Sequence, residues 1–364
     1  MQKQIVEIAK DFFLLRSKEE DFHRNIYIKR FTGTHGDSIT MVMDPGTQMD
    51  YPVLSTVLKD LIGGIKNIHL IFLSHQDPDV SSNVSAILAS APRAIVISSI
   101  DTWRLVKMYG IPEKRFKSIE SFKYDTLRIK KTGHYIQFIP AYYCHFRGAS
   151  MFYDHESKVL FSGDFLGGLN TRKGDGVFAT EDSWEGISLF HQIYMPSKKA
   201  VQATIDRIGL LNPLPEIIAP QHGDVIRGEL VAEFLGRLAT LDVGIDAEER
   251  TEAEIETLIV AFNDFLSMLK MTYPDFHSIL VNDLKTHGEF TTLFILTGDS
   301  ISGLKLLPKD VIYHLWKKLT AITPEETHNE LKGLFVSSLQ KFGVEIPDFL
   351  MPSEGSIGFA DIWG

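Results

Sequence analysis

The fold is decided by the stretch Ile68-His69-Leu70-Ile71-Phe72-Leu73-Ser74-His75-Gln76-Asp77-Pro78-Asp79-Val80, in which an apolar run leads directly into one imidazole and two carboxylates. A short apolar run of this kind is typical of a buried strand. His75, Asp77 and Asp79 then stand at alternate positions, so one piece of backbone offers three potential metal ligands. An Asp-Pro turn with a chance histidine would give the same letters, so the interpretation needs support from elsewhere in the chain.

Later segments repeat this arrangement of a hydrophobic run that ends in a potential ligand. Residues 136–145 end in His145, residues 159–164 end in Asp164, and residues 216–223 end in His222 before a glycine. Because strand ends of a layered α/β domain converge on one edge of the sheet, we expect one shared site. Six ligands exceed the need of one tetrahedral ion and suit two ions with a bridging carboxylate. The expected ligands are His75, Asp77, Asp79, His145, Asp164 and His222.

Together these motifs resemble the metallo-β-lactamase fold and, within it, the flavodiiron proteins, over roughly residues 25–240. The superfamily usually begins its site with His-x-His-x-Asp-His, whose imidazoles bind zinc in hydrolases. Flavodiiron proteins have a carboxylate at the second ligand position, which here is Asp77, although the family commonly has Glu there. The histidine that follows the aspartate in the family is Val80 in this chain, and a valine cannot ligate.

The resemblance implies a division of the ligands between two irons. The first iron would be held by His75, Asp77 and His145, the second by Asp79 and His222, with Asp164 as the bridge. Three carboxylates and three imidazoles favour iron over zinc, because hard oxygen donors suit iron or manganese; zinc and manganese remain alternatives. The missing ligand at Val80 leaves an open position on the second iron, where a diatomic ligand or hydroxide would bind.

Composition bounds the class of protein. The chain has 364 residues, 44% of them hydrophobic, which is enough for two domains. Its net charge of −10, without a Lys/Arg run interleaved with aromatic residues, argues against a nucleic-acid partner. The first 21 residues mix Lys, Glu and Asp, so we expect neither a signal peptide nor a membrane anchor. The single cysteine, Cys144, excludes an intramolecular disulfide and fits a reducing cytoplasm.

Strands and helices alternate along the first 244 residues and predict a four-layer αββα sandwich. A hairpin is expected around residues 154–157, where the chain passes from one strand to the next. The other predicted strands span 26–31, 38–46 and 93–98, and the predicted helices span 52–62, 81–90 and about 102–109.

Several residues near the motifs allow a functional and a structural interpretation. We expect Cys144 to be a core residue, and Tyr142 or Tyr143 to lie near the metals. His191, in an apolar stretch, is expected to be a hydrogen-bonded core histidine, and His35 to belong to a turn. The glycine-rich segment 165–195 is either a cover over the site or a surface insertion.

Residues 245–364 predict an all-helical module with a C-terminal tail. Helices are expected over 252–271, 308–319 and 324–342, and the charged run 246–250 fits a solvated helix start. Flavodiiron proteins carry a flavodoxin-like FMN domain in this position, and residues 291–300 imitate its phosphate loop poorly, so we expect no FMN. The tail, residues 352–364, either packs on its own domain or docks on a partner or a second copy in a homodimer.

Three functions remain open after the sequence alone. The leading hypothesis is a flavin-free di-iron protein that binds O2, with NO as a further ligand, and resembles oxygen-binding diiron proteins that act as sensors with a signalling partner. The second is an O2 or NO reductase supplied with electrons by an external redox partner. The third is a binuclear metallo-hydrolase that uses a metal-bound hydroxide. The carboxylate at Asp77 weighs against the hydrolase, and no catalytic residue beyond the ligands is assigned.

Overall fold

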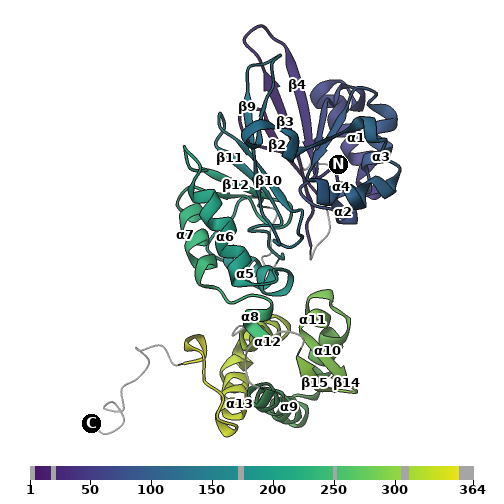
Figure 1. The fold of residues 1–364 in the computed structure, drawn as a ribbon. Helices are drawn as coiled ribbons and strands as arrows, with labels where there is room; N and C mark the ends of the chain where they lie inside the picture. The colour runs from purple at the N-terminus through teal and green to yellow at the C-terminus, as the bar shows by residue number, and fades with distance from the viewer. Residues whose placement is uncertain (1–4, 18–21, 171–175, 249–251, 305–310, 352–364) are drawn as a thin grey trace, which may run out of the picture. The chain divides into compact units, whose positions relative to one another are not determined.

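A computed structural model describes residues 5–17, 22–170, 176–248, 252–304 and 311–351 (Figure 1). Their contacts divide the chain into two compact units, Met1–Asp246 and Ala247–Gly364. The predicted boundary after residue 244 lies close to this division. Each unit has its own apolar core and is described by itself.

Two β-sheets form the centre of the first unit (Figure 1). The seven-stranded sheet runs in the order β1 to β7, antiparallel from β1 to β4 and parallel from β4 to β7. The six-stranded sheet runs in the order β13-β12-β11-β10-β9-β8, and β11 and β12 are parallel. The strands are β1 Ile5–Ala9, β2 Phe12–Arg16, β3 Asn25–Thr32, β4 Ser38–Met43, β5 Leu70–Phe72, β6 Ile95–Ser98, β7 Phe116–Ser118, β8 Thr126–Arg128, β9 Tyr135–Pro140, β10 Ser150–Asp154, β11 Val159–Gly163, β12 Ile217–Pro220 and β13 Ile226–Arg227.

Helices cover the outer face of each sheet, so the unit has four layers. One apolar cluster, which includes Ile71, Val57 and Ile87, joins the seven-stranded sheet to its helices. A second, with Phe72 and Phe161, fills the space between the sheets, and a third joins the six-stranded sheet to its helices. The predicted αββα metallo-β-lactamase sandwich is therefore confirmed. The helices are α1 Tyr51–Ile62, α2 Pro78–Ser81, α3 Val84–Ser90, α4 Ile100–Val106, α5 Ser183–Tyr194, α6 Lys198–Gly209, α7 Glu229–Thr240 and α8 Ile245–Glu248.

Local sequence signals explain where these helices begin and end. Pro52 lies in the first turn of α1, where its fixed φ is compatible with a helix. Gly63 ends that helix in the left-handed region at φ 78°, which a residue without a Cβ adopts at little cost. Ser99 and Ser197 cap α4 and α6 by accepting hydrogen bonds from the backbone N–H groups of Thr102 and Ala200.

The N-terminal hairpin of β1 and β2 was missing from the sequence-based expectations. Its charged residues hide the alternation, yet Phe12 and Leu14 are fully buried between the sheets. The predicted helix over 81–90 is two helices in the structure, α2 and α3, and α2 begins within the ligand-bearing stretch itself. Asp77 is the N-cap residue of α2, and Asp79 lies in its first turn.

The second unit is mainly helical, but it is not all-helical as predicted. Strands β14 and β15 form an antiparallel hairpin, because Phe294-Ile295-Leu296-Thr297 is a strand-forming run and Gly298, at φ 63°, permits a tight turn. The aromatic rings of Phe262, Phe265 and Phe335 pack together in the core. Its elements are α9 Glu252–Thr272, α10 Pro274–Thr286, α11 Gly288–Leu293, β14 Phe294–Thr297, β15 Ser300–Leu304, α12 Val311–Ile322 and α13 His328–Lys341.

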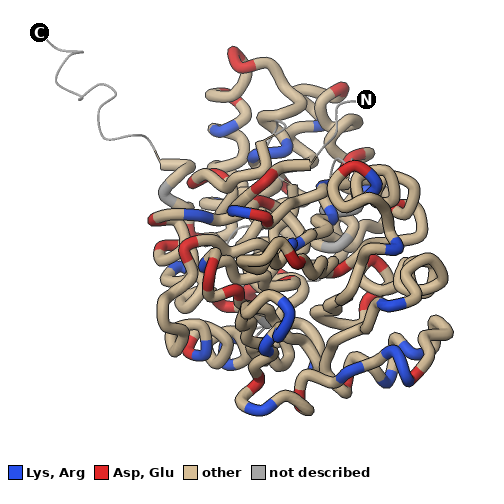
Figure 2. Tube along the Cα trace, turned by 90° about the horizontal axis from the view of Figure 1, so that it is seen from above, with Lys and Arg blue, Asp and Glu red and all other residues tan. Residues whose placement is uncertain are grey.

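Two expectations concern residues at the limits of the description. The tail of residues 352–364 lies outside the described residues, and so do residues 249 and 250 of the charged run. Within the described residues, no helix combines the length and the apolar character needed to cross a bilayer. Basic and acidic residues are interspersed along the trace (Figure 2).

Candidate metal centre

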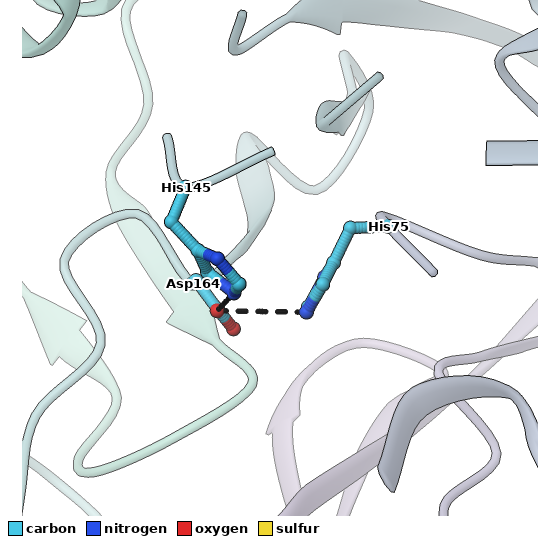
Figure 3. Close-up of side chains that lie close together, drawn as sticks. All are labelled: His75, His145 and Asp164. Atoms are coloured by element: carbon cyan, nitrogen blue, oxygen red, sulfur yellow. Dashed lines mark ion pairs between the residues drawn. The ribbon is translucent and has the colours of Figure 1, made fainter. Parts of the chain in front are cut away.

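The ends of β5, β11 and β12, and the loop after β9, bring the six predicted ligand residues together. We call His75, Asp77 and His145 the first ligand group, and Asp79 and His222 the second ligand group. Asp164 lies between the two groups. Figure 3 shows the imidazoles of His75 and His145 directed at the Asp164 carboxylate.

The first ligand group surrounds one oxygen of Asp164. The Nε2 atoms of His75 and His145 lie 3.5 and 2.9 Å from Asp164 Oδ2. The same two nitrogens lie 3.6 and 3.2 Å from Asp77 Oδ2. His75, His145 and Asp164 each offer one ligand atom within 4.8 Å of the others, a spacing that fits a single cation in their midst.

The orientation of the His75 ring is fixed by hydrogen bonds on its Nδ1 side, away from the other ligands. Its Nδ1 lies 2.9 Å from Ser74 Oγ, and Ser74 Oγ donates to Asp44 Oδ2 at 2.5 Å. The backbone N–H of Ser74 donates to the other oxygen of Asp44. Burial raises the pKa of Asp44 to about 7, against the opposing effects of His75 and Ser74. This chain of hydrogen bonds directs the Nε2 atom of His75 into the site.

The second ligand group faces the other oxygen of Asp164. His222 Nε2 lies 3.3 Å from Asp79 Oδ2 and 3.8 Å from Asp164 Oδ1. The Nδ1 atom of His222 lies 2.9 Å from the carbonyl oxygen of His23, which accepts its hydrogen. The Phe22 ring stacks on the His222 imidazole with centroids 3.8 Å apart. His222 is thus held by a backbone acceptor and an aromatic face.

Asp164 has the geometry of a bridging carboxylate. It is 4% exposed, and each of its oxygens faces a different set of imidazoles. Its Oδ1 is buried and has no hydrogen-bond partner among the described residues. A buried carboxylate oxygen without a hydrogen-bond donor is costly unless a cation lies beside it.

The charges of the site also suit cations. Burial lowers the pKa of His75, but Asp164 and Asp77 outweigh it and raise the pKa to about 9. Burial likewise opposes protonation of His145, and the same two carboxylates raise its pKa to about 10. The pKa values of Asp77 and Asp164 are lowered by these imidazoles, although burial acts in the opposite direction. Without metal, protons on the imidazoles provide the positive charge that the carboxylates require.

The donor set therefore fits a pair of metal ions. It combines hard carboxylate oxygens with imidazole nitrogens, a combination suited to iron, manganese or zinc. Cations bound there would replace the protons on His75 and His145, so metal binding would release protons.

Val80 is fully buried and belongs to the apolar cluster between the seven-stranded sheet and its helices. It lies next to Asp79 in α2, where the resembled family has a histidine. The second ligand group consequently contains one imidazole, whereas the first contains two.

Tyr194, which was not named from the sequence, lies beside the ligand His145. Its ring centroid is 6.1 Å from that of His145, and its pKa is raised by burial and by three carboxylates of the site, Asp164, Asp79 and Asp77. By contrast, Tyr142 packs against two arginine side chains, and Tyr143 is 53% exposed. Tyr194 ends the apolar stretch 189–194, and its distance along the chain from every ligand motif concealed it.

The expectations for three single residues, Cys144, His191 and His35, agree with the structure. Cys144 is a buried core residue, 3.5 Å from Thr204 Oγ1. His191 is fully buried: its Nε2 accepts from the backbone N–H of Leu166, and its Nδ1 donates to a backbone oxygen. Burial lowers its pKa to about 4, so this core histidine is neutral. His35 is exposed in a turn. Part of segment 165–195 forms α5, which carries Tyr194, while residues 171–175 lie outside the description.

The fold and the paired donor groups define a metallo-β-lactamase-like chain. A family model described as ODP family beta lactamase matches residues 23–223, which is more than half of the chain. The chain belongs to this family.

Three solved structures share the fold of the first unit. The apo state of the chemotaxis sensor ODP from T. denticola has 26% sequence identity and a TM-score of 0.55, over 67% of this chain and 96% of that one. A structure described as a peroxy diiron species of the chemotaxis sensor ODP has 26% identity and a TM-score of 0.53, over 67% and 98%. The flavodiiron protein from Giardia intestinalis, at 13% identity and a TM-score of 0.57 over 76% and 71%, shares the fold.

Curated relatives are longer flavoproteins. The putative diflavin flavoprotein A 1 of Nostoc sp. is 23% identical over 269 residues, which are 71% of this chain and 44% of the relative. The type A flavoprotein fprA of Rhodobacter capsulatus is 24% identical over 293 residues, 74% of this chain and 63% of the relative. The chain thus spans about half the length of these relatives. The activities of the whole relatives are therefore not assigned to this chain by the match.

Proposed function

We propose that this chain is a di-iron protein that binds O2 and serves as an oxygen sensor or oxygen-binding protein. The observation that carries the proposal is the position of Asp164, whose Oδ2 faces His75 and His145 and whose Oδ1 faces His222. A carboxylate that presents each oxygen to a separate set of imidazoles suits two ions sharing one bridge. The relative described as a peroxy diiron species supports iron and an oxygen ligand.

In this proposal His75, Asp77 and His145 would hold one iron, Asp79 and His222 would hold the other, and Asp164 would contribute to both. A reduced iron pair would supply the electrons for reversible binding of O2 or NO. Ser74 holds the His75 ring in place through Nδ1. Phe22 and Phe190 give the His222 side of the site an apolar wall, which excludes water. The Tyr194 hydroxyl is the proposed hydrogen-bond donor to a bound ligand.

The second unit supports a sensor over a flavoprotein. Its described strands form a two-stranded antiparallel hairpin, whereas a flavodoxin-like FMN site uses the carboxyl ends of parallel strands. We propose that this unit binds no FMN and passes the state of the iron site to a protein partner or a second copy of the chain. The protein would then act in the cytoplasm, away from membranes and nucleic acid.

Metal analysis and oxygen uptake test the proposal. Protein purified without oxygen should contain about two irons per chain, as two ligand groups require. Mixed with O2, the reduced protein should take up oxygen in one stoichiometric step with a lasting change in its visible spectrum. The His145→Ala variant should lose this step.

Two outcomes would overturn the proposal. Sustained oxygen uptake with NADH and a generic flavoprotein reductase would make the protein a reductase. Two tightly bound zinc ions after growth in iron-sufficient medium would favour the hydrolase.

A further inference from the structure

Gln221 lies directly before His222 and is held by its backbone on both sides. Its N–H donates to the carbonyl oxygen of Gly163 at 2.8 Å, and its own carbonyl accepts from the N–H of Asn25 at 2.7 Å. The residue is 1% exposed. Because both sheets fix the backbone and the surroundings are closed, the side chain has little freedom of direction.

The terminal amide of Gln221 reaches the second ligand group. Its Nε2 lies 3.1 Å from Asp79 Oδ2, the same oxygen that lies 3.3 Å from His222 Nε2. Two donor atoms bound to one ion at about 2.1 Å, with an angle near 90°, lie about 3 Å apart. The amide and the imidazole therefore flank Asp79 Oδ2 at the spacing expected of ligands that share an ion.

The amide oxygen has no function in the metal-free arrangement. Gln221 Oε1 is buried without a hydrogen-bond partner among the described residues. A half-turn of the terminal amide exchanges its oxygen and nitrogen without changing the shape of the side chain. That rotation places a neutral oxygen donor beside Asp79 Oδ2, and amide oxygens are hard ligands of the kind that iron and manganese accept.

Gln76 beside the first ligand group also has a buried Oε1 without a hydrogen-bond partner among the described residues, and differs from Gln221 in its position. Its Nε2 donates to Asp77 Oδ1 at 2.7 Å, whereas His75 and His145 face the other oxygen, Oδ2. Gln76 thus holds the carboxylate from the side turned away from the imidazoles. Gln221 contacts the oxygen turned towards them, so the two glutamines have different positions relative to the metal.

We propose that the Gln221 amide oxygen is a ligand of the second metal ion, in the place that Val80 leaves without a donor. The inference rests on the proposed function, since it deepens the assignment of the second ligand group. That group then contains Asp79, His222, Gln221 and the shared Asp164. Fewer imidazoles and one neutral oxygen make this ion the more weakly held of the two.

The test is a metal titration of the metal-free protein, with ferrous iron under anaerobic conditions and separately with zinc. Gln221→Leu, in which the new side chain is close in size, should lower the affinity for the second ion at least about tenfold and leave the affinity for the first unchanged. Gln221→Glu retains an oxygen donor and adds a charge, so it should hold the second ion as tightly as the wild type or more tightly. Mössbauer spectra of the iron-loaded Gln221→Glu protein should show one altered iron site and one unaltered.

Gln76→Leu and Gln76→Glu are the matched controls. Both remove a donor to the far oxygen of Asp77, so both should weaken the first ion modestly and leave the second alone. Melting curves of the metal-free proteins check folding. If Gln221→Leu does not fold, Gln221→Glu still decides the matter by the direction of its effect.

Two results would overturn the inference. One is a lower affinity of Gln221→Glu for the second ion. That result would mean that Gln221 acts by donating an N–H to Asp79 and not by offering its oxygen to the ion. The other is Gln221→Leu binding both ions like the wild type. A chain that binds zinc and no iron would refute the proposed function while the zinc titration still tested Gln221. If the wild type loads iron and binds oxygen as proposed, and the Gln221 variants bind both ions like the wild type, only the assignment of Gln221 as a ligand is refuted.

Discussion

The two ligand groups share Asp164 but differ in composition and surroundings. The first contains two imidazoles, and its Asp77 and His145 side chains are 33% and 21% exposed. The second contains one imidazole, His222, which is 3% exposed and covered by the Phe22 ring. Although the short segment 75–80 contributes ligands to both groups, the valine at position 80 makes them unequal.

This difference indicates how one bridging carboxylate can serve two unequal ions. The first ligand group approaches Asp164 Oδ2 to 2.9 Å, whereas His222 stays 3.8 Å from Oδ1. A group with more imidazoles and shorter spacing binds its ion more tightly. We therefore expect the ions to bind in order, with the first ligand group occupied before the second.

The largest effect should come from removing the shared residue. Asp164→Ala takes one oxygen from each ligand group, so both ions should be lost, as measured by metal analysis after anaerobic loading with iron. Asp164→Asn is the matched control, because it retains one oxygen and should retain at least one ion. If Asp164→Ala still held one ion at wild-type affinity, the bridge would be misassigned.

The next effect is confined to the first ligand group. Ser74→Ala removes the hydroxyl that joins His75 Nδ1 to Asp44. Loss of such an orienting partner typically lowers metal affinity about 10- to 100-fold. A calorimetric titration should therefore show weaker binding of the first ion and an unchanged second.

Ser162→Ala is the control for that titration. Ser162 Oγ is also buried, but it has no hydrogen-bond partner among the described residues. Its removal should leave both affinities as in the wild type. Equal effects of the two serine variants would show that general packing, and not the orientation of His75, governs the first ion.

The pH dependence of the metal-free protein should report the first ligand group. The pKa values of His75 and His145 are raised to about 9 and about 10, so their stabilisation is complete below the unfolded value of about 6.5. It is lost as the pH rises through the raised values. The melting temperature should accordingly fall between about pH 7 and pH 10.

The carboxylates act at the other end of the pH scale. The pKa values of Asp77 and Asp164 are lowered, so their stabilisation is present above the unfolded value of about 3.9 and lost as the pH falls below it.

His145→Ala is the control for the alkaline transition. The melting temperature of this variant should fall less between about pH 7 and pH 10 than that of the wild type. The same decline in both proteins would attribute the alkaline transition to groups elsewhere.

Much of this comparison was predictable from the sequence. Each ligand follows a hydrophobic run, and the ends of such runs converge in a layered fold, so the αββα sandwich and the meeting of six residues could be predicted. The resemblance to flavodiiron proteins also predicted which residues lie in each ligand group. His191 could be interpreted as a core histidine because its neighbours are apolar.

The surroundings of the ligands were not predictable in this way. Phe22 and Tyr194 act through contacts between segments distant in sequence, and Ser74 links the adjacent His75 to the distant Asp44. No local pattern distinguishes these three from ordinary core or loop residues. Gln221 directly precedes His222 in the sequence, but only its distance to Asp79 in the structure indicates a role in metal binding. The hairpin of β14 and β15 was missed because its apolar run is short and lies between helices.

The smallest expected effect concerns the aromatic cover of the second ligand group. Phe22→Leu keeps an apolar side chain but removes the ring stacked 3.8 Å from the His222 centroid. Aromatic pairs of this kind contribute about 0.5–1.5 kcal/mol beyond the area they bury, which corresponds to a weakening of the second ion by roughly 2- to 13-fold. The first ion should be unaffected, because His75 and His145 lie on the other oxygen of Asp164. Phe165→Leu, which removes a buried ring packed on the core histidine His191, is the control and should change stability without changing either affinity. A weakening of both ions in Phe22→Leu would mean that the two groups respond as one unit, and the comparison drawn between them would fail.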